Sequence, residues 1–257
     1  MISVLSPAKS LDFDKPTQLN NYTIPEYLEQ SEQLIAKLRT LSRKKIGALM
    51  SISPSLAALN HERYSNWNLP FDVANAKPAA AVFNGDVYRG LDAASFSEAD
   101  WGYAQEHLRI LSGLHGLLRP LDLIQPYRLE MGTRLSVRRK KNLYEFWGDK
   151  VTDSINETFA SQDEKVLLNL ASIEYFKVIR PNKVAGRIVS ANFREFKNGE
   201  YKTIMTFAKQ ARGLMASYII KNRIEKVEDI KGFDVAGYSF NDRFSTGDDW
   251  IFTRDKF

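Results

Sequence analysis

The chain has 257 residues, of which 44% are apolar and 12% aromatic, and its 36 Lys and Arg against 31 Asp and Glu give a formal net charge of +5. This length and apolar content predict a folded core and exclude general disorder. The absence of cysteine excludes disulfides, thiolate metal sites and thiol nucleophiles. No apolar run is long enough for a membrane span or a secretory signal, so we expect a cytoplasmic protein with one domain over residues 1–257.

Hydrophobic periodicity predicts interleaved strands and helices along the chain. The expected strands are Ile2–Leu5, Ala79–Phe83 and Val166–Leu170, with a hairpin at Asn198-Gly199 and a last hairpin pairing Gly237–Phe240 with Trp250–Thr253. The expected helices are 27–41, a pair at about 43–60, one from Ser97 through Leu111, 143–159 and Ala208–Asn222. Because a regular strand–helix alternation is absent, we predict the mixed α+β class, with a mixed sheet and surrounding helices in a single compact domain.

Positive charge is concentrated in one segment of the chain. Between Arg109 and Lys141 there are eight Arg and Lys against two acids, a net charge of +6, which leaves −1 for all other residues. Clustered positive charge attracts polyanions, so nucleic acid or a phosphorylated ligand is the expected partner. For the run Arg138-Arg139-Lys140-Lys141, a solvated loop is an equal alternative.

Residues 44–60 resemble a helix-hairpin-helix. Apolar residues at helical spacing occupy two arms, and a tight Ser-Ile-Ser-Pro turn at 51–54 separates them. Such a turn presents backbone N–H groups to a phosphate, and Ser51, Ser53, Ser55, Lys44 and Lys45 would add contacts. The glycines usual in this motif are replaced by serines, so an ordinary helical corner is the alternative.

Further candidates stand at predicted strand ends and in the basic segment. Lys9 follows the first strand and can bind phosphate or, if desolvated, act as a base, with a surface lysine as the alternative. Glu130 can supply a carboxylate for acid–base or metal chemistry, or pair with Arg128. Segments 169–177 and 209–215 are each expected to begin where a strand ends and a helix starts, where backbone dipoles favour anions. Capping by Ser172 and stacking of Arg212 on an aromatic ring are the alternatives there.

The three histidines are His61, His107 and His115, and none has the upstream glutamate spacing of a di-iron bundle. We therefore expect no metal and no other cofactor. His107 and His115 flank one predicted helix, and a packed, hydrogen-bonded histidine is the favoured interpretation of each.

Six motifs together are similar to the YaaA family of peroxide stress resistance proteins: SPAKSLDF at 6–13, FNGDVYRGL at 83–91, LRPLDLIQPYRLEMG at 118–132, FWGD at 146–149, NLASIEYFK at 169–177 and ARGLM at 211–215. The resemblance implies a cytoplasmic bacterial protein that limits hydrogen peroxide damage by keeping free iron low. It also implies a mixed α/β fold with a helix-hairpin-helix in a positively charged, DNA-binding cleft. It places the hairpin at 44–60 and a lysine motif at Lys9, and it assigns no catalytic residue.

Residues and resemblance together predict a DNA-binding protein of the oxidative stress response, with weak sequence preference and duplex or irregular duplex DNA as its partner. No membrane or protein partner is expected. The predicted DNA contacts are Lys9, Lys44, Lys45, Ser51, Ser53, Ser55, Arg109, Arg119, Arg128, Arg134, Lys177, Lys209 and Arg212. The alternative is an enzyme that acts on a phosphorylated or nucleic-acid substrate in a basic cleft. Its active-site candidates are Lys9, Asp86, Glu130, Asp149 and Glu174.

Overall fold

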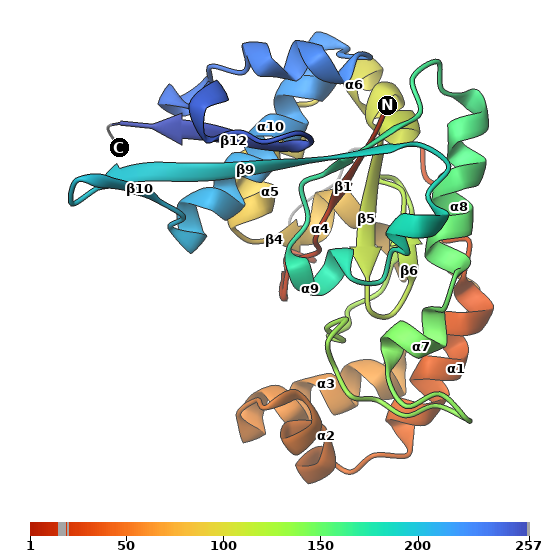
Figure 1. Ribbon diagram of the computed structural model, residues 1–257. Helices are drawn as coiled ribbons and strands as arrows, with labels where there is room; N and C mark the ends of the chain where they lie inside the picture. The colour runs from red at the N-terminus through yellow and green to blue at the C-terminus, as the bar shows by residue number, and fades with distance from the viewer. Residues whose placement is uncertain (15–18, 20, 256–257) are drawn as a thin grey trace.

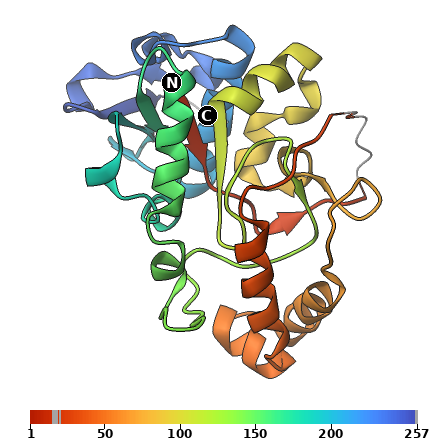
Figure 2. The ribbon, with the colours of Figure 1, turned by 90° about the vertical axis from the view of Figure 1, so that its right-hand side faces the viewer.

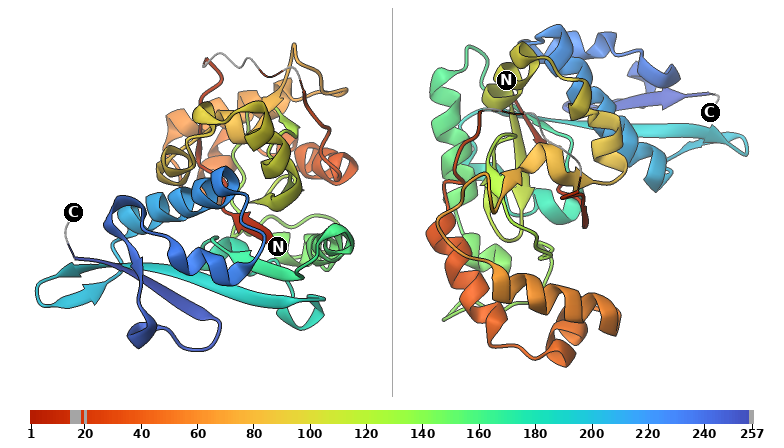
Figure 3. Two further views of the ribbon diagram at one scale, coloured as in Figure 1. Left: turned by 90° about the horizontal axis from the view of Figure 1, so that it is seen from above. Right: turned by 180° about the vertical axis from the view of Figure 1, so that it is seen from behind.

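A mixed sheet runs through the upper part of the molecule and organises the fold (Figure 1). The structure, a computed structural model, describes residues 1–14, 19 and 21–255. The strand order is β11-β12-β9-β8-β1-β5-β6, and β10 pairs with β9. Helices α5, α6 and α10 cover one face, while α8 lies on the other (Figure 3). The predicted class, a mixed sheet with surrounding helices, is confirmed.

The strands and helices have the following bounds. The strands are β1 (Ile2–Leu5), β2 (Ser10–Leu11), β3 (Lys77–Pro78), β4 (Phe83–Asn84), β5 (Leu108–Ser112), β6 (Gly116–Leu118), β7 (Leu123–Ile124), β8 (Val166–Asn169), β9 (Arg187–Lys197), β10 (Glu200–Lys202), β11 (Ser239–Phe240) and β12 (Asp249–Arg254). The α-helices are α1 (Leu28–Arg39), α2 (Arg43–Met50), α3 (Pro54–Asn66), α4 (Ala79–Val82), α5 (Asp86–Leu91), α6 (Glu98–His107), α7 (Leu143–Trp147), α8 (Lys150–Thr158), α9 (Ile173–Phe176) and α10 (Met205–Asn222). Across the described residues, none of these helices combines the length and the hydropathy needed to cross a membrane.

The centre of the sheet is parallel. Strand β1 runs parallel to both β5 and β8, and the parallel pairing continues from β8 to β9 and β12. Strands β1 and β5 are buried along their whole length, as expected for parallel strands covered on both faces. The carboxyl ends of β1, β5, β8 and β9 therefore meet at one edge, which is the usual place for a ligand site in such sheets.

Several predicted elements are confirmed. The strands at Ile2–Leu5 and Val166–Asn169 form as expected, and β9 and β10 join through Asn198 and Gly199, whose φ angles are 56° and 84°. Both angles lie in the left-handed region that a tight two-residue turn requires, which Asn and Gly tolerate. The last hairpin also forms, because β11 pairs antiparallel with β12.

Other predictions were wrong. Residues Ala79–Val82 form the short helix α4 instead of a strand, because a run of alanines favours a helix. The helix from Ser97 ends at His107, and Leu108–Ser112 is the buried strand β5. The predicted helix 143–159 breaks at Gly148, whose φ is 57°. Residues 209–215 lie inside α10 rather than at a helix start.

A second group of helices lies below the sheet (Figures 1 and 2). We call α1, α2, α3, α7 and the loop 133–142 the helical lobe. The lobe is tied to the segment that follows β7 by the Tyr64 hydroxyl, which donates to the carbonyl of Arg128. Within the lobe, Arg39 of α1 donates to the carbonyls of Tyr64 and Trp67, at 2.7 Å to Tyr64, and so fixes α3 against α1.

Candidate functional site

Four segments that are far apart in the sequence meet at the carboxyl ends of the parallel strands. The Ser172 amide, after β8, donates to the Ser6 hydroxyl, after β1, at 2.9 Å. Strands β2 and β4 then pair Ser10 with Asn84, and a Cβ at Gly85 would lie only 3.3 Å from the Ala8 side chain. We call residues 6–9, 84–86, 128–132 and 172–174 the strand-end cluster.

Lys9, Arg128 and Glu130 form an ion-pair network in this cluster. Lys9 Nζ lies 2.8 Å from one Glu130 oxygen, and Arg128 Nη2 lies 2.8 Å from the other. Burial alone would raise the pKa of Glu130, but the hydrogen bonds and charges of Lys9 and Arg128 lower it below its usual value. Glu130 is therefore ionised at neutral pH and is suited to fixing Lys9 and Arg128 rather than to donating a proton.

Glu174 and Asp86 complete the acidic part of the cluster. Glu174 Oε1 accepts a hydrogen bond from the Gly132 amide at 2.9 Å, which joins α9 to the segment that carries Glu130. Asp86, at the start of α5, pairs with Arg89 one turn later. Both carboxylates thus have protein partners: Glu174 is joined to the segment that carries Glu130, whereas Asp86 pairs within α5.

Asp149 and Lys177 lie outside that network. Asp149 precedes α8 and pairs with Lys183 at 2.6 Å and with Arg180 at 3.8 Å. The hydrogen bond from Lys183 is the main cause that lowers the pKa of Asp149. Lys177 is exposed and stands 5.2 Å from the centre of the Tyr144 ring.

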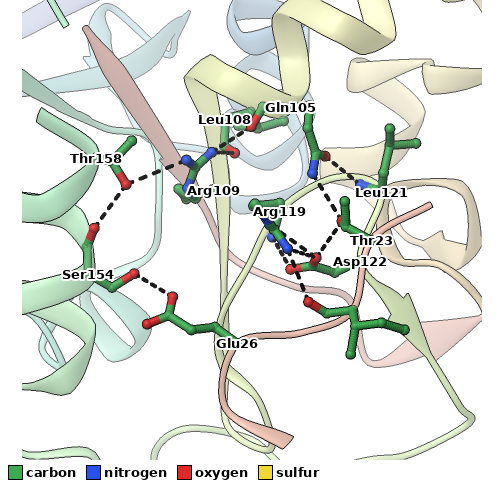
Figure 4. Close-up of polar contacts among 11 residues, drawn as sticks. Thr23, Glu26, Gln105, Leu108, Arg109, Arg119, Leu121, Asp122, Ser154 and Thr158 are labelled. Carbon is green, nitrogen blue, oxygen red and sulfur yellow. Dashed lines mark hydrogen bonds and ion pairs between the residues drawn. The ribbon is translucent and has the colours of Figure 1, made fainter. Parts of the chain in front are cut away.

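Two predicted DNA contacts, Arg109 and Arg119, form hydrogen bonds within the protein (Figure 4). Arg109 is 7% exposed and donates to the carbonyls of Gln105 and Leu108 at 2.8 and 2.9 Å. Burial, followed by the charge of Arg119, lowers the pKa of Arg109 to about 10. Arg119 donates through Nε and Nη2 to Asp122 at 3.1 and 2.9 Å. The Arg109 guanidinium is therefore closed to a phosphate, and the Arg119 guanidinium, on a side chain that is 38% exposed, is already engaged by Asp122.

The helical lobe carries the serines and lysines of the predicted hairpin. Helices α2 and α3 are joined by Ser51–Ser53, with Ser51 at a φ of 51°. Ser53 caps α3 by accepting from the Leu56 amide at 3.3 Å, and it exchanges a 3.0 Å hydrogen bond with Ser55. The side chains of Lys44 and Lys45 are exposed at the far end of α2, and within the described residues they have no hydrogen-bond or ion-pair partner.

The basic loop of the lobe is also exposed. Arg134, Arg138, Arg139, Lys140 and Lys141 are all on the surface, and no described residue pairs with their side chains. Thus Arg109, Arg119 and Arg128 of the basic segment are held by the protein itself, whereas the residues from Arg134 onward remain open to solvent.

Sequence reasoning missed the residues that hold these segments in place. Tyr127 donates to or accepts from the Ser112 hydroxyl at 2.7 Å, and burial raises its pKa. Tyr88 donates to the Ser6 carbonyl at 3.1 Å, and burial likewise raises its pKa. A signal was present for Tyr88 and Ser6, because each lies inside a family motif, but their contact depends on long-range packing that no local pattern shows.

The histidines are packed. His115 is fully buried, its Nδ1 lies 2.9 Å from the Ser31 hydroxyl, and burial lowers its pKa to about 3. His107 stacks on Tyr103 with ring centroids 3.9 Å apart. Over residues 1–14, 19 and 21–255, no group of three His, Asp or Glu side chains is placed to hold a metal ion.

Comparison with known proteins decides the family. The family described as peroxide stress protein YaaA matches residues 1–244. The chain belongs to the YaaA family. Its relatives include UPF0246 proteins of Ralstonia pickettii, 55% identical over 254 residues, of Colwellia psychrerythraea, 51% identical over 254 residues, and of Cellvibrio japonicus, 47% identical over 256 residues. Each match covers at least 99% of both chains, so this YaaA family member shares its full length with them, and the resemblance seen in its motifs is confirmed.

Proposed function

We propose that this YaaA family member binds the phosphate backbone of DNA through its helical lobe, in the cytoplasm, as part of the defence against hydrogen peroxide. The observation that carries this proposal is the unpaired positive charge of the lobe, at Lys44 and Lys45 on α2 and at 134–141 in the loop. Unpaired exposed cations release counterions when they meet a polyanion, which is the main source of sequence-independent DNA affinity.

The α2–α3 turn gives this charge a fixed geometry. A rise of about 1.5 Å per residue places Lys44 roughly 10 Å along the axis from Ser51, so the lysines and the serines contact different phosphates of one strand. The contacts proposed at the turn are the exposed hydroxyls of Ser51, Ser53 and Ser55. Contacts of these groups with phosphates carry no sequence information, so weak sequence preference follows.

A protective role follows from phosphate binding. Iron bound along the phosphate backbone generates radicals beside the bases, and a protein that covers phosphates displaces such cations by the same counterion release. Limitation of iron-driven damage would then be indirect, without a thiol, since the chain has no cysteine.

The test is fluorescence anisotropy of a labelled duplex over a salt series from about 50 to 200 mM. With four to six phosphates neutralised, log K should fall against log[salt] with a slope of about −4 to −5, and Lys44→Ala with Lys45→Ala should reduce the steepness by up to ~2. The matched control is Lys165→Ala with Lys226→Ala, two exposed lysines outside the lobe. An unchanged slope in the α2 variant, or no binding at the lowest salt, would remove the lobe from the interface.

An enzyme acting on a phosphorylated or nucleic-acid substrate is a second candidate function. The observation in its favour is the convergence of Lys9, Glu130 and Glu174 on one strand end. Glu130→Gln discriminates between the two functions. Normal duplex affinity with lost protection of peroxide-treated cells would favour catalysis, whereas full protection would count against it.

A further inference from the structure

Arg212 on α10 is a partly buried charge for which the described residues supply no counterpart. Its Nε is sealed from solvent and has no hydrogen-bond partner, and no described residue accepts a hydrogen bond from its guanidinium or pairs with it. Burial lowers the pKa of Arg212. Arg109 is the contrast, because its buried guanidinium is satisfied by backbone carbonyls.

An uncompensated guanidinium is costly to bury. Its planar fork of donors matches the oxygens of a phosphoryl group. An unpaired guanidinium in the free protein can therefore bind an anion. The position of Arg212 shows where in the molecule that anion would bind.

The neighbours of α10 fix the direction in which Arg212 lies. A Cβ at Gly213 would approach the Val87 carbonyl to 1.8 Å, so that side of α10 faces α5. Phe207 lies under the guanidinium of Arg254, and Tyr218 contacts Phe233. The side of α10 that carries Phe207 and Tyr218 therefore faces the C-terminal segment. At 100° per residue, Arg212 lies on the flank away from Phe207 and Tyr218. Since α10 packs on β9 and β1, this flank faces the sheet.

The segment of α10 that carries Arg212 lies against α5. A Cβ at Gly90 would approach the Gln210 carbonyl to 2.1 Å, so the two helices are in close contact there. The α5 residue Tyr88 donates to the Ser6 carbonyl at 3.1 Å. Arg212 therefore lies on the part of α10 that α5 joins to Ser6, in the strand-end cluster.

We propose that Arg212 binds a phosphoryl group at the strand-end cluster, beside the hydroxyl of Ser172 and the ammonium of Lys9. The Ser172 hydroxyl accepts from Ser6 at 3.3 Å, and no acceptor for its own proton is found in the described part of the chain. Lys9 has three donors, of which Glu130 takes one. These donors with one guanidinium suit a dianion better than a carboxylate. This site lies outside the helical lobe and does not depend on the DNA proposal.

Isothermal titration calorimetry of the whole protein with inorganic phosphate tests the site. Arg212→Gln should weaken phosphate binding by about 10-fold or more. Lys209→Gln, an exposed residue three positions earlier on α10, is the matched control and should leave it unchanged. Equal binding by the Arg212 variant, or no binding by the native protein at about 20 mM phosphate, would overturn the proposal.

Two further measurements separate binding from folding and from DNA contact. Without phosphate, Arg212→Gln should melt at the same or a higher temperature, since it removes an uncompensated buried charge, whereas a lower Tm would mean that Arg212 serves the fold. Phosphate binding should survive Lys44→Ala with Lys45→Ala. Titration with a 5′-phosphorylated and an unphosphorylated oligonucleotide then identifies the source of the phosphoryl group. A preference for the phosphorylated oligonucleotide assigns the group to a DNA end, and equal binding assigns it to a small phosphate ester.

Discussion

Apart from Arg212, the strand-end cluster pairs its positive charge within the protein, whereas the helical lobe leaves positive charge unpaired. Above the lobe, Arg119 is paired with Asp122, and Lys9 and Arg128 are paired with Glu130. In the lobe, no described residue pairs with the side chains of Lys44 and Lys45 or with the basic side chains of the loop 134–141. Paired charges stabilise the native state, whereas unpaired charges are available to bind a polyanion. Substitutions in the two regions should therefore separate stability from DNA affinity.

The largest expected effect on stability is at Asp122. This carboxylate is 1% exposed and accepts from the Arg119 amide and guanidinium and from the Thr23 hydroxyl. Asp122→Ala leaves these donors without an acceptor and should cost about 2–4 kcal/mol in urea unfolding. Asp229→Ala, at an exposed acid, is the control. A loss below that of the control would show that the network does not support the fold.

His115 should make stability depend on pH. Burial lowers the pKa of His115 from 6.5 to about 3. Below pH 6.5 this histidine is therefore protonated in the unfolded chain but stays neutral in the folded chain. Stability should fall by about 1.4 kcal/mol for each pH unit below 6.5, down to about pH 3. His115→Gln should lose this part of the slope in urea unfolding at pH 7, 6 and 5. An identical slope in both proteins would contradict a buried neutral histidine.

Glu130 should have a smaller effect at lower pH. Its folded pKa is below 4.5, so its contribution is present above pH 4.5 and is lost as pH falls through the folded value. Glu130→Gln should cost about 1 kcal/mol at pH 7 and remove this loss in acid. Exposed Glu62→Gln serves for comparison. Duplex affinity at constant salt should stay at the native value, and a weaker affinity would place Glu130 in DNA binding.

The smallest effect on stability is expected in the basic loop. Arg138→Ala with Arg139→Ala should change the unfolding free energy by less than about 0.5 kcal/mol. The same variant should make the salt dependence of duplex binding shallower by up to ~2 in slope. A loop that is merely solvated would leave that slope at the native value.

Local sequence patterns predicted some elements of this structure but not those that depend on long-range packing. Strands β1 and β8 and the Asn198-Gly199 turn were predictable, because each is a short apolar run or a turn with its own residue preference. Strand β5 was not, since Leu108 and Leu111 continue the helical spacing of α6, and only the parallel pairing with β1 makes them a strand. Lys9 and Glu130 were identified as candidates, but burial of Arg109 could not be, because a charge count treats every arginine alike.

Hydrogen–deuterium exchange with and without a duplex tests the central claim most directly. The account predicts slower exchange on DNA binding in the α2–α3 turn and in residues 134–141, with no change in β9 and β10. Slower exchange in the strand-end cluster alone, with the lobe unaffected, would contradict the assignment of the DNA surface to unpaired charge in the helical lobe.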